Sequence, residues 1–289
     1  MTVEVLRYAA FTRDGKGGNP AGVVLDAGCL ADAQMLAVAQ AIGYSETAFL
    51  LPPEAAGGLH IRYFSPRAEV AFCGHATVAT AVAHAERHGT GRLHLVTPAG
   101  PVTVDTQRTA AGITATLTSP PASARPLAPS VLEQALAALH WSPTDLHPGY
   151  PAQVASAGND HLVVGVASAA VLDRFDYDYA LLAQLMADQL WTTVHAFWPE
   201  TRDRFHARNA FPPGGVVEDP ATGAAAAAFG GYLRDLGRLA PGQLVTVLQG
   251  HKMGAPSELL VSPAPDGDRM HVSGAAAPIA LSAYNQEPG

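Results

Sequence analysis

The sequence predicts an α/β (α+β) protein of two similar domains, each a curved, barrel-like, mostly antiparallel sheet around a central alanine-rich helix. The first observation is a repeated motif. Gly-His-Ala-Thr at residues 74–77 and Asp-Pro-Ala-Thr at 219–222 each open an alanine-rich stretch. The second observation is that the two motifs lie half the chain length apart. Repeats of this length are whole domains, because they are too long for solenoid units.

The first half contains one amphipathic helix among short strands. Residues 31–42 carry apolar side chains at helical spacing and end at Gly43, which suits a helix C-cap. A glycine-rich turn at 15–20 separates the first two strands. The expected strands are residues 3–10, 21–26, 46–51, 59–64, 93–96, 102–104 and 113–117.

The second half repeats this arrangement. Helical periods cover residues 131–139 and 177–190, and strands are expected at 244–248, 259–261 and 270–272. In each half one helix, at 77–87 and at 222–233, is apolar on nearly every face, which is typical of a helix buried on all sides. We therefore expect each of these two helices to be surrounded by its sheet.

A segment with four prolines, residues 119–130, separates the halves and is predicted to be an extended linker. The expected domains are residues 1–120 and 125–275, and a return of residues 278–289 to the first domain is left open. Two duplicated domains usually place a ligand site in the cleft between them.

Composition favours a compact cytoplasmic protein that acts on a small molecule. The chain has 289 residues, 48% of them hydrophobic, and a formal net charge of −8. Only two lysines, Lys16 and Lys252, are present. This charge argues against a nucleic-acid or membrane partner. We expect neither a signal peptide nor a membrane-spanning segment. Two cysteines, Cys29 and Cys73, are too few for a disulfide framework.

The starts of the two alanine-rich helices are candidate anion sites. Gly74 and Pro220 stand where each helix begins, and unpaired backbone N–H groups at two such ends can bind a carboxylate or an enolate. The alternative is that both residues only start helices, as proline does well in a first turn. The duplication favours the functional interpretation.

Four side chains near these starts are candidates for chemistry. Glu46 lies at the mouth of an apolar strand, which suits a general acid/base, although a solvated strand end would look the same. His75 and Asp219 occupy matching places in the two motifs and could hold a substrate and pass a proton. His75 could equally cap its helix. Cys73 precedes a helix, so it is either a reactive thiol or a small buried residue.

Motifs for common cofactors fail on spacing. Gly15-x-Gly17-x-x-Pro20 breaks the dinucleotide fingerprint at its third glycine, and neither lysine has a setting that suits pyridoxal phosphate. His84 and His88 have a zinc-compatible spacing on a helix, but a third ligand is missing from the surrounding sequence. We therefore expect no cofactor and no metal.

Five ordered motifs resemble those of the PhzF-like isomerases of phenazine biosynthesis, relatives of the diaminopimelate epimerase fold. The resemblance spans nearly the whole chain. Its motifs lie at residues 18–23 (GNPAGV), 45–49 (SETAF), 72–77 (FCGHAT), 218–223 (EDPATG) and 249–254 (QGHKMG). It implies two similar domains, each a sheet rolled round a central helix, with a cofactor-free site between them.

The resemblance further implies that Glu46 moves a proton between carbons of an unsaturated small acid while His75 and Asp219 hold the substrate. In the phenazine pathway that substrate is a dihydro-hydroxyanthranilate. We also expect the protein to form a homodimer. The expected substrate-binding residues are Asn19, Ser45, Cys73, Gly74, Gly223 and Ala224.

The chain departs from the family pattern at two positions. Ala224 stands where members commonly have serine, and Ala255 stands where many have arginine. The epimerase relatives use two cysteines, and only Cys73 matches one, so a two-thiol racemase is not the leading interpretation. A racemase or epimerase of an amino or hydroxy acid remains the alternative, and a non-catalytic metabolite-binding protein is a third.

Overall fold

The computed structural model describes residues 3–53, 58–110 and 112–280. It confirms a mixed α/β protein and divides into two compact units. Unit 1 comprises residues up to 117 together with the described residues from 273 onward, and unit 2 comprises residues 118–272. Of the expected return segment 278–289, residues 281–289 lie outside the described residues.

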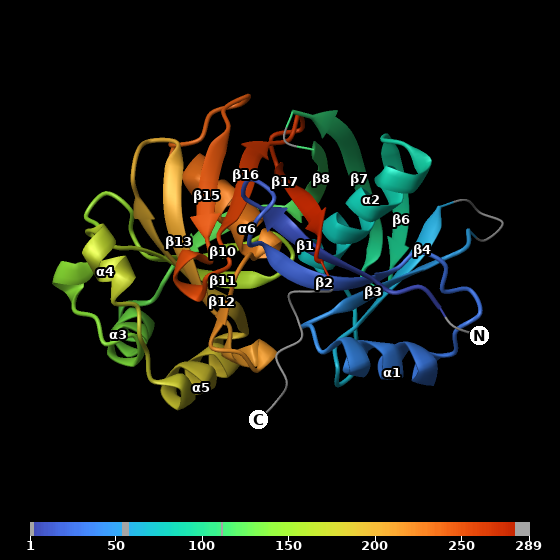
Figure 1. Ribbon diagram of the computed structural model, residues 1–289. Helices are drawn as coiled ribbons and strands as arrows, with labels where there is room; N and C mark the ends of the chain where they lie inside the picture. Colours follow the sequence, from blue (N-terminus) through green and yellow to red (C-terminus); the bar gives the residue numbers. More distant parts are fainter. Residues whose placement is uncertain (1–2, 54–57, 111, 281–289) are drawn as a thin grey trace. The chain divides into compact units, whose positions relative to one another are not determined.

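Unit 1 is a mainly antiparallel sheet with two parallel pairs. Its elements are β1 (Leu6–Thr12), β2 (Asn19–Val24), α1 (Asp32–Ile42), β3 (Thr47–Leu51), β4 (Leu59–Phe64), β5 (Glu69–Val70), α2 (Gly74–His88), β6 (Arg92–Thr97), β7 (Gly100–Thr109) and the first part of β8 (Gly112–Pro121), with the end of β17 (Arg269–Pro278). The parallel pairs β2–β3 and β4–β6 are each joined by a helix crossover, as Figure 1 shows.

The sheet of unit 1 closes on itself. Strand β17 pairs with β1 and also with β8, which continues the antiparallel series β6–β7–β8. Thr116 Oγ1 and Ser273 Oγ are 2.7 Å apart across that closure. Closure leaves no exposed edge between β1 and β8.

Unit 2 repeats the same series of pairings. Its elements are β9 (Ser123–Pro126), α3 (Pro129–Ala138), β10 (Gln153–Ser156), β11 (Asp160–Gly165), α4 (Ala169–Asp173), α5 (Tyr179–Gln189), β12 (Trp191–Pro199), β13 (Arg204–Ala210), β14 (Glu218–Asp219), α6 (Gly223–Asp235), β15 (Val245–Gln249) and β16 (Ser257–Pro263). Strand pairs β11–β12 and β13–β15 are parallel; α4 and α5 lie between the strands of the first pair, and α6 between those of the second. Three short 3₁₀ turns, Pro143–Asp145, Pro212–Gly214 and His251–Met253, complete the described elements.

Both alanine-rich helices are buried. From His75 to Ala83 every residue of α2 is buried, and α2 packs on β1, β2, β3 and β7. Helix α6 is buried from Ala225 to Leu233 and packs on β9, β10, β11, β12 and β16. Glycine allows one close approach here, because a Cβ on Gly231 would lie 2.7 Å from Ala122 Cβ. Small side chains thus let each helix sit inside its sheet.

The prolines of residues 119–130 do not make a linker, so that expectation is wrong. Pro120 and Pro121 end β8, β9 pairs in full with β10, and Pro129 is the first residue of α3. Proline tolerates strand ends and first helical turns, where no backbone N–H is needed. The end of α1 is as expected: Gly43 adopts φ 72°, the left-handed C-cap conformation.

Among the described residues, no helix is long and apolar enough to cross a membrane.

Candidate active site

Glu46 stands at the last position before β3. Its carbonyl accepts a hydrogen bond from Gly22 N at 3.1 Å, which ties it to the parallel strand β2. A Cβ on Gly22 would lie 2.5 Å from Thr47 Oγ1, so the close approach of the two strands requires glycine there. The Glu46 side chain is 19% exposed. It therefore has limited but direct access to solvent.

Cys73 and His75 are presented by the start of α2. Cys73 is the N-cap with an extended backbone (φ −145°, ψ 113°), and His75 lies in the first turn. Thr77 Oγ1 donates to the Cys73 carbonyl at 2.7 Å and lies 2.6 Å from the hydroxyl of Tyr63. Burial raises the pKa of Tyr63, so this hydroxyl stays protonated. These bonds fix the helix start within the core.

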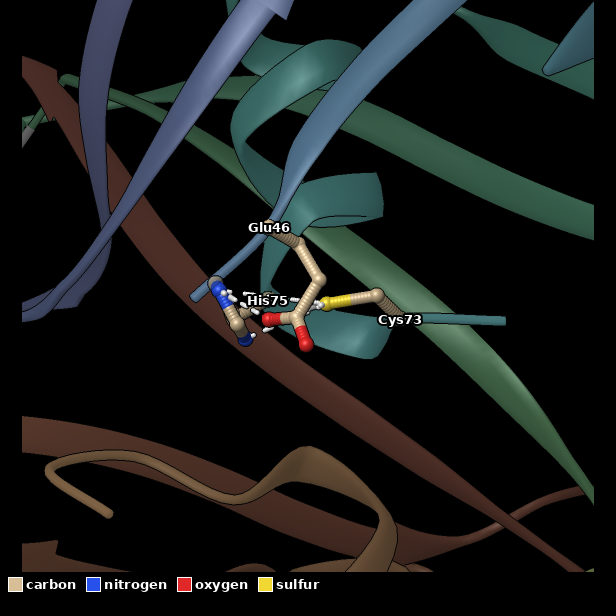
Figure 2. Close-up of side chains that lie close together, drawn as sticks. All are labelled: Glu46, Cys73 and His75. Atoms are coloured by element: carbon tan, nitrogen blue, oxygen red, sulfur yellow. Dashed lines mark hydrogen bonds and ion pairs between the residues drawn. The ribbon is translucent and has the colours of Figure 1, made fainter. Parts of the chain in front are cut away.

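The side chains of Glu46, Cys73 and His75 converge, as Figure 2 shows. Cys73 Sγ lies 3.5 Å from Glu46 Oε2 and 3.3 Å from His75 Nδ1. His75 Nε2 lies 3.5 Å from Glu46 Oε2. A carboxyl, a thiol and an imidazole group thus lie in mutual contact, where each could exchange a proton with another or with a bound molecule.

Three other expected residues lie at the same end of the unit 1 sheet. Ser45 Oγ is 3.4 Å from His75 Nε2, and Gly74 is the first helical residue of α2. Asn19 begins β2 and is buried. It precedes Gly22, which pairs with Thr47, so it lies toward the Glu46 end of the two parallel strands.

Asp219 has its own hydrogen-bonded setting in unit 2. Thr222 Oγ1 donates to Asp219 Oδ2 at 2.5 Å, and Gln249 Nε2 donates to the Asp219 carbonyl at 2.6 Å. Gln249 Nε2 also lies 3.1 Å from Thr222 Oγ1. The amide of Gln249, itself buried, therefore holds the turn between β14 and α6 in place.

Gln249 and Thr222 are residues that the sequence reasoning did not select for the site. The signal for Gln249 was present, because a polar residue ends a mainly apolar strand directly before Gly250. Gly250 adopts φ +76°, and a Cβ there would lie 2.7 Å from the Pro220 carbonyl oxygen. The Gln-Gly pair thus joins the end of β15 to the turn that carries Asp219.

Helix starts show that His75 and Asp219 are not matching positions, which corrects the motif alignment. Cys73 and Thr222 are the two N-caps, each followed by glycine at the first helical position. His75 therefore corresponds to Ala224, whereas Asp219 lies three residues before its N-cap. The shared Ala-Thr letters had aligned the motifs four residues out of register.

The structure gathers the expected site residues in two groups. Glu46, Cys73 and His75, with Ser45 and Gly74, lie together in unit 1. In unit 2, Gly223 and Ala224 form the first turn of α6, after the Asp219 turn. That Asp219 and His75 hold the same substrate stays a prediction.

Unit 1 also contains a cavity of about 500 Å³ that is separate from this cluster. It lies at the opposite end of β3, where Leu51 pairs with His60. Arg62, a charged residue that lines this cavity, is already engaged by Asp32 and Glu69. The titratable cluster, not this cavity, is therefore the candidate active site.

Comparison of the whole chain with protein families and curated proteins gives consistent matches. The family model described as phenazine biosynthesis-like protein matches residues 8–281. An uncharacterized isomerase of Deinococcus radiodurans is 35% identical over 280 residues, covering 93% of this chain and 90% of the relative. The trans-2,3-dihydro-3-hydroxyanthranilate isomerase of Pseudomonas chlororaphis is 32% identical over 252 residues, 86% of each chain.

Solved structures agree with these matches. A PhzF-family phenazine biosynthesis protein of Bacillus anthracis gives a TM-score of 0.85 at 25% identity, covering 97% of this chain and 98% of the other. A predicted epimerase of Pseudomonas aeruginosa gives 0.81 at 28% identity, covering 96% and 98%. A probable proline racemase of Agrobacterium radiobacter, at 13% identity and TM-score 0.62 over 99% and 95% of the chains, shares the fold alone.

Proposed function

Because this chain belongs to the phenazine biosynthesis-like family of isomerases, we propose that it moves a proton between carbon atoms of a small carboxylic acid without a cofactor. The observation that carries the proposal is the Glu46 carboxylate, partly exposed and in contact with Cys73 and His75. One carboxylate is sufficient for the reaction. It takes a proton from one carbon and returns it to another after the electron pair has moved along a conjugated double bond.

The surrounding groups have distinct parts in this proposal. Backbone N–H groups in the first turn of α2 bind the substrate carboxylate or the enolate that forms when the proton leaves. His75 donates a hydrogen bond to the same carboxylate or enolate. Asp219, held by Thr222 and Gln249, binds a polar group of the substrate. Asn19, Ser45, Gly74 and Gly223 complete the lining. We further propose that the active protein is a homodimer.

The substrate we propose is a cyclic or dihydroaromatic hydroxy acid. This follows from the name of the Pseudomonas chlororaphis relative, which identifies it as an isomerase of trans-2,3-dihydro-3-hydroxyanthranilate. Ala224 lacks the hydroxyl that many family members have at the first turn of this helix, so the substrate of this chain should need one hydrogen bond fewer there. A related acid without one of the polar substituents fits that difference.

A racemase is the second candidate, because Cys73 lies beside Glu46 and gives the cluster two groups able to exchange a proton. Its weakness is the N-cap of α6. A second thiol would belong at that position, which is occupied by Thr222.

Reaction in deuterium oxide separates these functions. The protein is incubated with trans-2,3-dihydro-3-hydroxyanthranilate, with related cyclic acids and with proline-type amino acids, and products are followed by NMR. We expect deuterium at a new carbon together with a shifted double bond. Inversion at a stereocentre without a double-bond shift would establish the racemase instead. Binding without any exchange would leave a non-catalytic protein.

A further inference from the structure

We propose that Glu46, Cys73 and His75 also form a binding site for a soft divalent cation, with Zn²⁺ as the best fit. The three residues are the only group of three or more potential ligands in the described part of the chain whose donor atoms converge in this way. Their donor atoms lie within 4.8 Å of one another. They supply one sulfur, one nitrogen and one oxygen, the ligand types that zinc accepts.

The spacing of these donors matches a zinc coordination sphere. With Zn–S of about 2.3 Å, and Zn–N and Zn–O of about 2.0–2.2 Å, the edges of a tetrahedron are about 3.4 to 3.6 Å long. The corresponding separations are 3.5 Å from Cys73 Sγ to Glu46 Oε2, 3.8 Å from Cys73 Sγ to His75 Nε2, and 3.5 Å from His75 Nε2 to Glu46 Oε2. The three separations match the edges of one face of a tetrahedron. The His75 ring must turn for Nε2 to point at the ion, because Cys73 Sγ lies closer to Nδ1, at 3.3 Å.

The backbone arrangement favours binding because the main chain that carries two of the three ligands is held in place beforehand. Cys73 and His75 lie two residues apart at the start of one helix, and the Thr77 bonds hold that start in the core. The Glu46 side chain is 19% exposed, so water can reach the cluster. A water molecule there completes four-coordination.

Charge also balances at the site. A thiolate and a carboxylate together carry two negative charges, which neutralise a divalent cation, and the imidazole binds as the neutral base. Binding therefore releases the thiol proton to the buffer. Thiolate and imidazole ligands select Zn²⁺ or Co²⁺ over Mg²⁺ and Ca²⁺, which prefer oxygen.

The bound ion would block the proposed isomerase, since the Glu46 carboxylate cannot take a proton while it holds the metal. The inhibition rests on the proposed function, whereas the metal site itself does not. The protein would then be active with the site empty and reversibly inhibited by zinc. Addition of a chelator would restore activity.

The chain supplies two controls. Helix α2 carries His84 and His88 one turn apart, with ring centroids separated by 4.5 Å, and metal bound there would involve no thiolate. The exposed Cys29 is a thiol outside the three-residue cluster. The variants Cys29→Ala and His84→Ala/His88→Ala therefore test whether binding comes from those positions instead.

Cobalt titration provides a direct readout, because tetrahedral Co²⁺ bound to a thiolate gives intense visible bands and a thiolate-to-metal charge-transfer band. We expect both with one equivalent of Co²⁺ on the reduced, full-length protein, and displacement by one equivalent of Zn²⁺. Cys73→Ala should lose the charge-transfer band. His75→Ala and Glu46→Gln should lose tight binding. Both control variants should behave as the wild type, and circular dichroism checks that every variant is folded.

The outcomes distinguish the metal site from the isomerase. No 1:1 binding to wild type, or a charge-transfer band that survives in Cys73→Ala, would overturn the metal site. Zinc binding with no activity toward any acid would leave the site intact and remove the proposed function. Full activity at saturating zinc would overturn the inhibition.

Discussion

Units 1 and 2 share one architecture but differ in the side chains at the start of the central helix. Each unit has the same order of antiparallel pairs, two parallel crossovers and a buried alanine-rich helix. In unit 1 that helix begins at Cys73, and in unit 2 at Thr222. His75 of α2 corresponds to Ala224 of α6. The fold is therefore compatible with threonine and alanine at these positions.

Strand register extends the comparison to Glu46. Thr47 pairs with Phe64, as Val194 pairs with Ala210, so Glu46 corresponds to Thr193 in unit 2. Thr193 is buried and bonds to His161 Nδ1 at 2.8 Å. Unit 2 therefore forms the same turns without a glutamate, a cysteine or a histidine at the three matching positions. This asymmetry supports a functional origin for the cluster.

One ion pair is retained in both units. Arg62 donates two hydrogen bonds to Glu69 across β4 and β5, and Arg208 donates the same two to Glu218 across β13 and β14. The unit 2 pair is more buried, with exposed side-chain fractions of 16% and 7% compared with 25% and 35%. Loss of the matching ion pair should therefore lower the free energy of unfolding by a different amount in each unit.

The largest expected effect is on catalysis, because a substitution at Glu46 in unit 1 should abolish most of the turnover, whereas one at the matching position of unit 2 should not. Glu46→Gln removes the proposed base and keeps the shape, and we expect turnover to fall by about 10² to 10⁴ on whichever acid the deuterium experiment identifies as the substrate. Thr193→Ser, at the matching position of unit 2, serves as the control and should leave turnover nearly unchanged. Activity of Glu46→Gln close to wild type would contradict the mechanism.

Acid should destabilise unit 2 through two buried histidines. Burial lowers the pKa of His161 to about 3 and that of His195 to about 4, against 6.5 in the unfolded chain. The unfolded state therefore binds more protons between pH 6.5 and about 4, and stability is lost as pH falls through that window. At pH 5 each histidine should lower the free energy of unfolding by about 2 kcal/mol relative to pH 7.5.

Urea unfolding at pH 7.5 and pH 5 measures this loss, and His195→Gln should remove about half of it. A free energy of unfolding that does not change between the two pH values would mean that these histidines are not held neutral. The same result would contradict the assignment of acid sensitivity to unit 2.

The two ion pairs should respond differently to one substitution. Glu218→Gln leaves the largely covered Arg208 charge without its buried partner, and we expect a loss of about 3 kcal/mol. Glu69→Gln affects a partly exposed pair and should cost about 1 kcal/mol or less. Thermal or urea unfolding of the two variants side by side gives the comparison directly. Equal losses would show that burial does not distinguish the bridges.

The smallest expected effect is at the helix start. Cys73→Ala should cost about 1 kcal/mol of stability, because a small buried side chain is lost, and should leave most of the activity. Cys73→Thr copies the N-cap of unit 2 and should be at least as stable as Cys73→Ala. Stability is measured by unfolding and activity by the isomerase assay. Loss of activity in both variants would favour the racemase.

Much of the fold followed from the sequence because its signals are local or repeated. Alanine on every face predicted the burial of α2 and α6, and Gly43 predicted the end of α1. The motif alignment is wrong because the two four-residue motifs, 74–77 and 219–222, both end in Ala-Thr but lie at different distances from their helix starts. Residues 119–130 were misjudged because proline content does not reveal whether a strand end or a helix start will accommodate it.

The site was less accessible to sequence reasoning than the fold. Glu46 and His75 were identifiable through their motifs, and the structure shows that they meet. The role of Gln249 depends on a contact between the end of β15 and a turn some thirty residues away. Such a contact has no local periodicity. The proximity of Cys73 to Glu46 likewise depends on how α2 packs against β2 and β3.

Strand β17 has a consequence for how the chain folds during synthesis. Its last residues pair with β1, so the closed sheet of unit 1 lacks one strand until residue 278 has left the ribosome. Unit 2 is one continuous stretch, whereas unit 1 is assembled from both ends of the chain. The half that is translated first is therefore the half that closes last. Until then, the strands on either side of the gap present unpaired edges on which chaperones or neighbouring nascent chains can act.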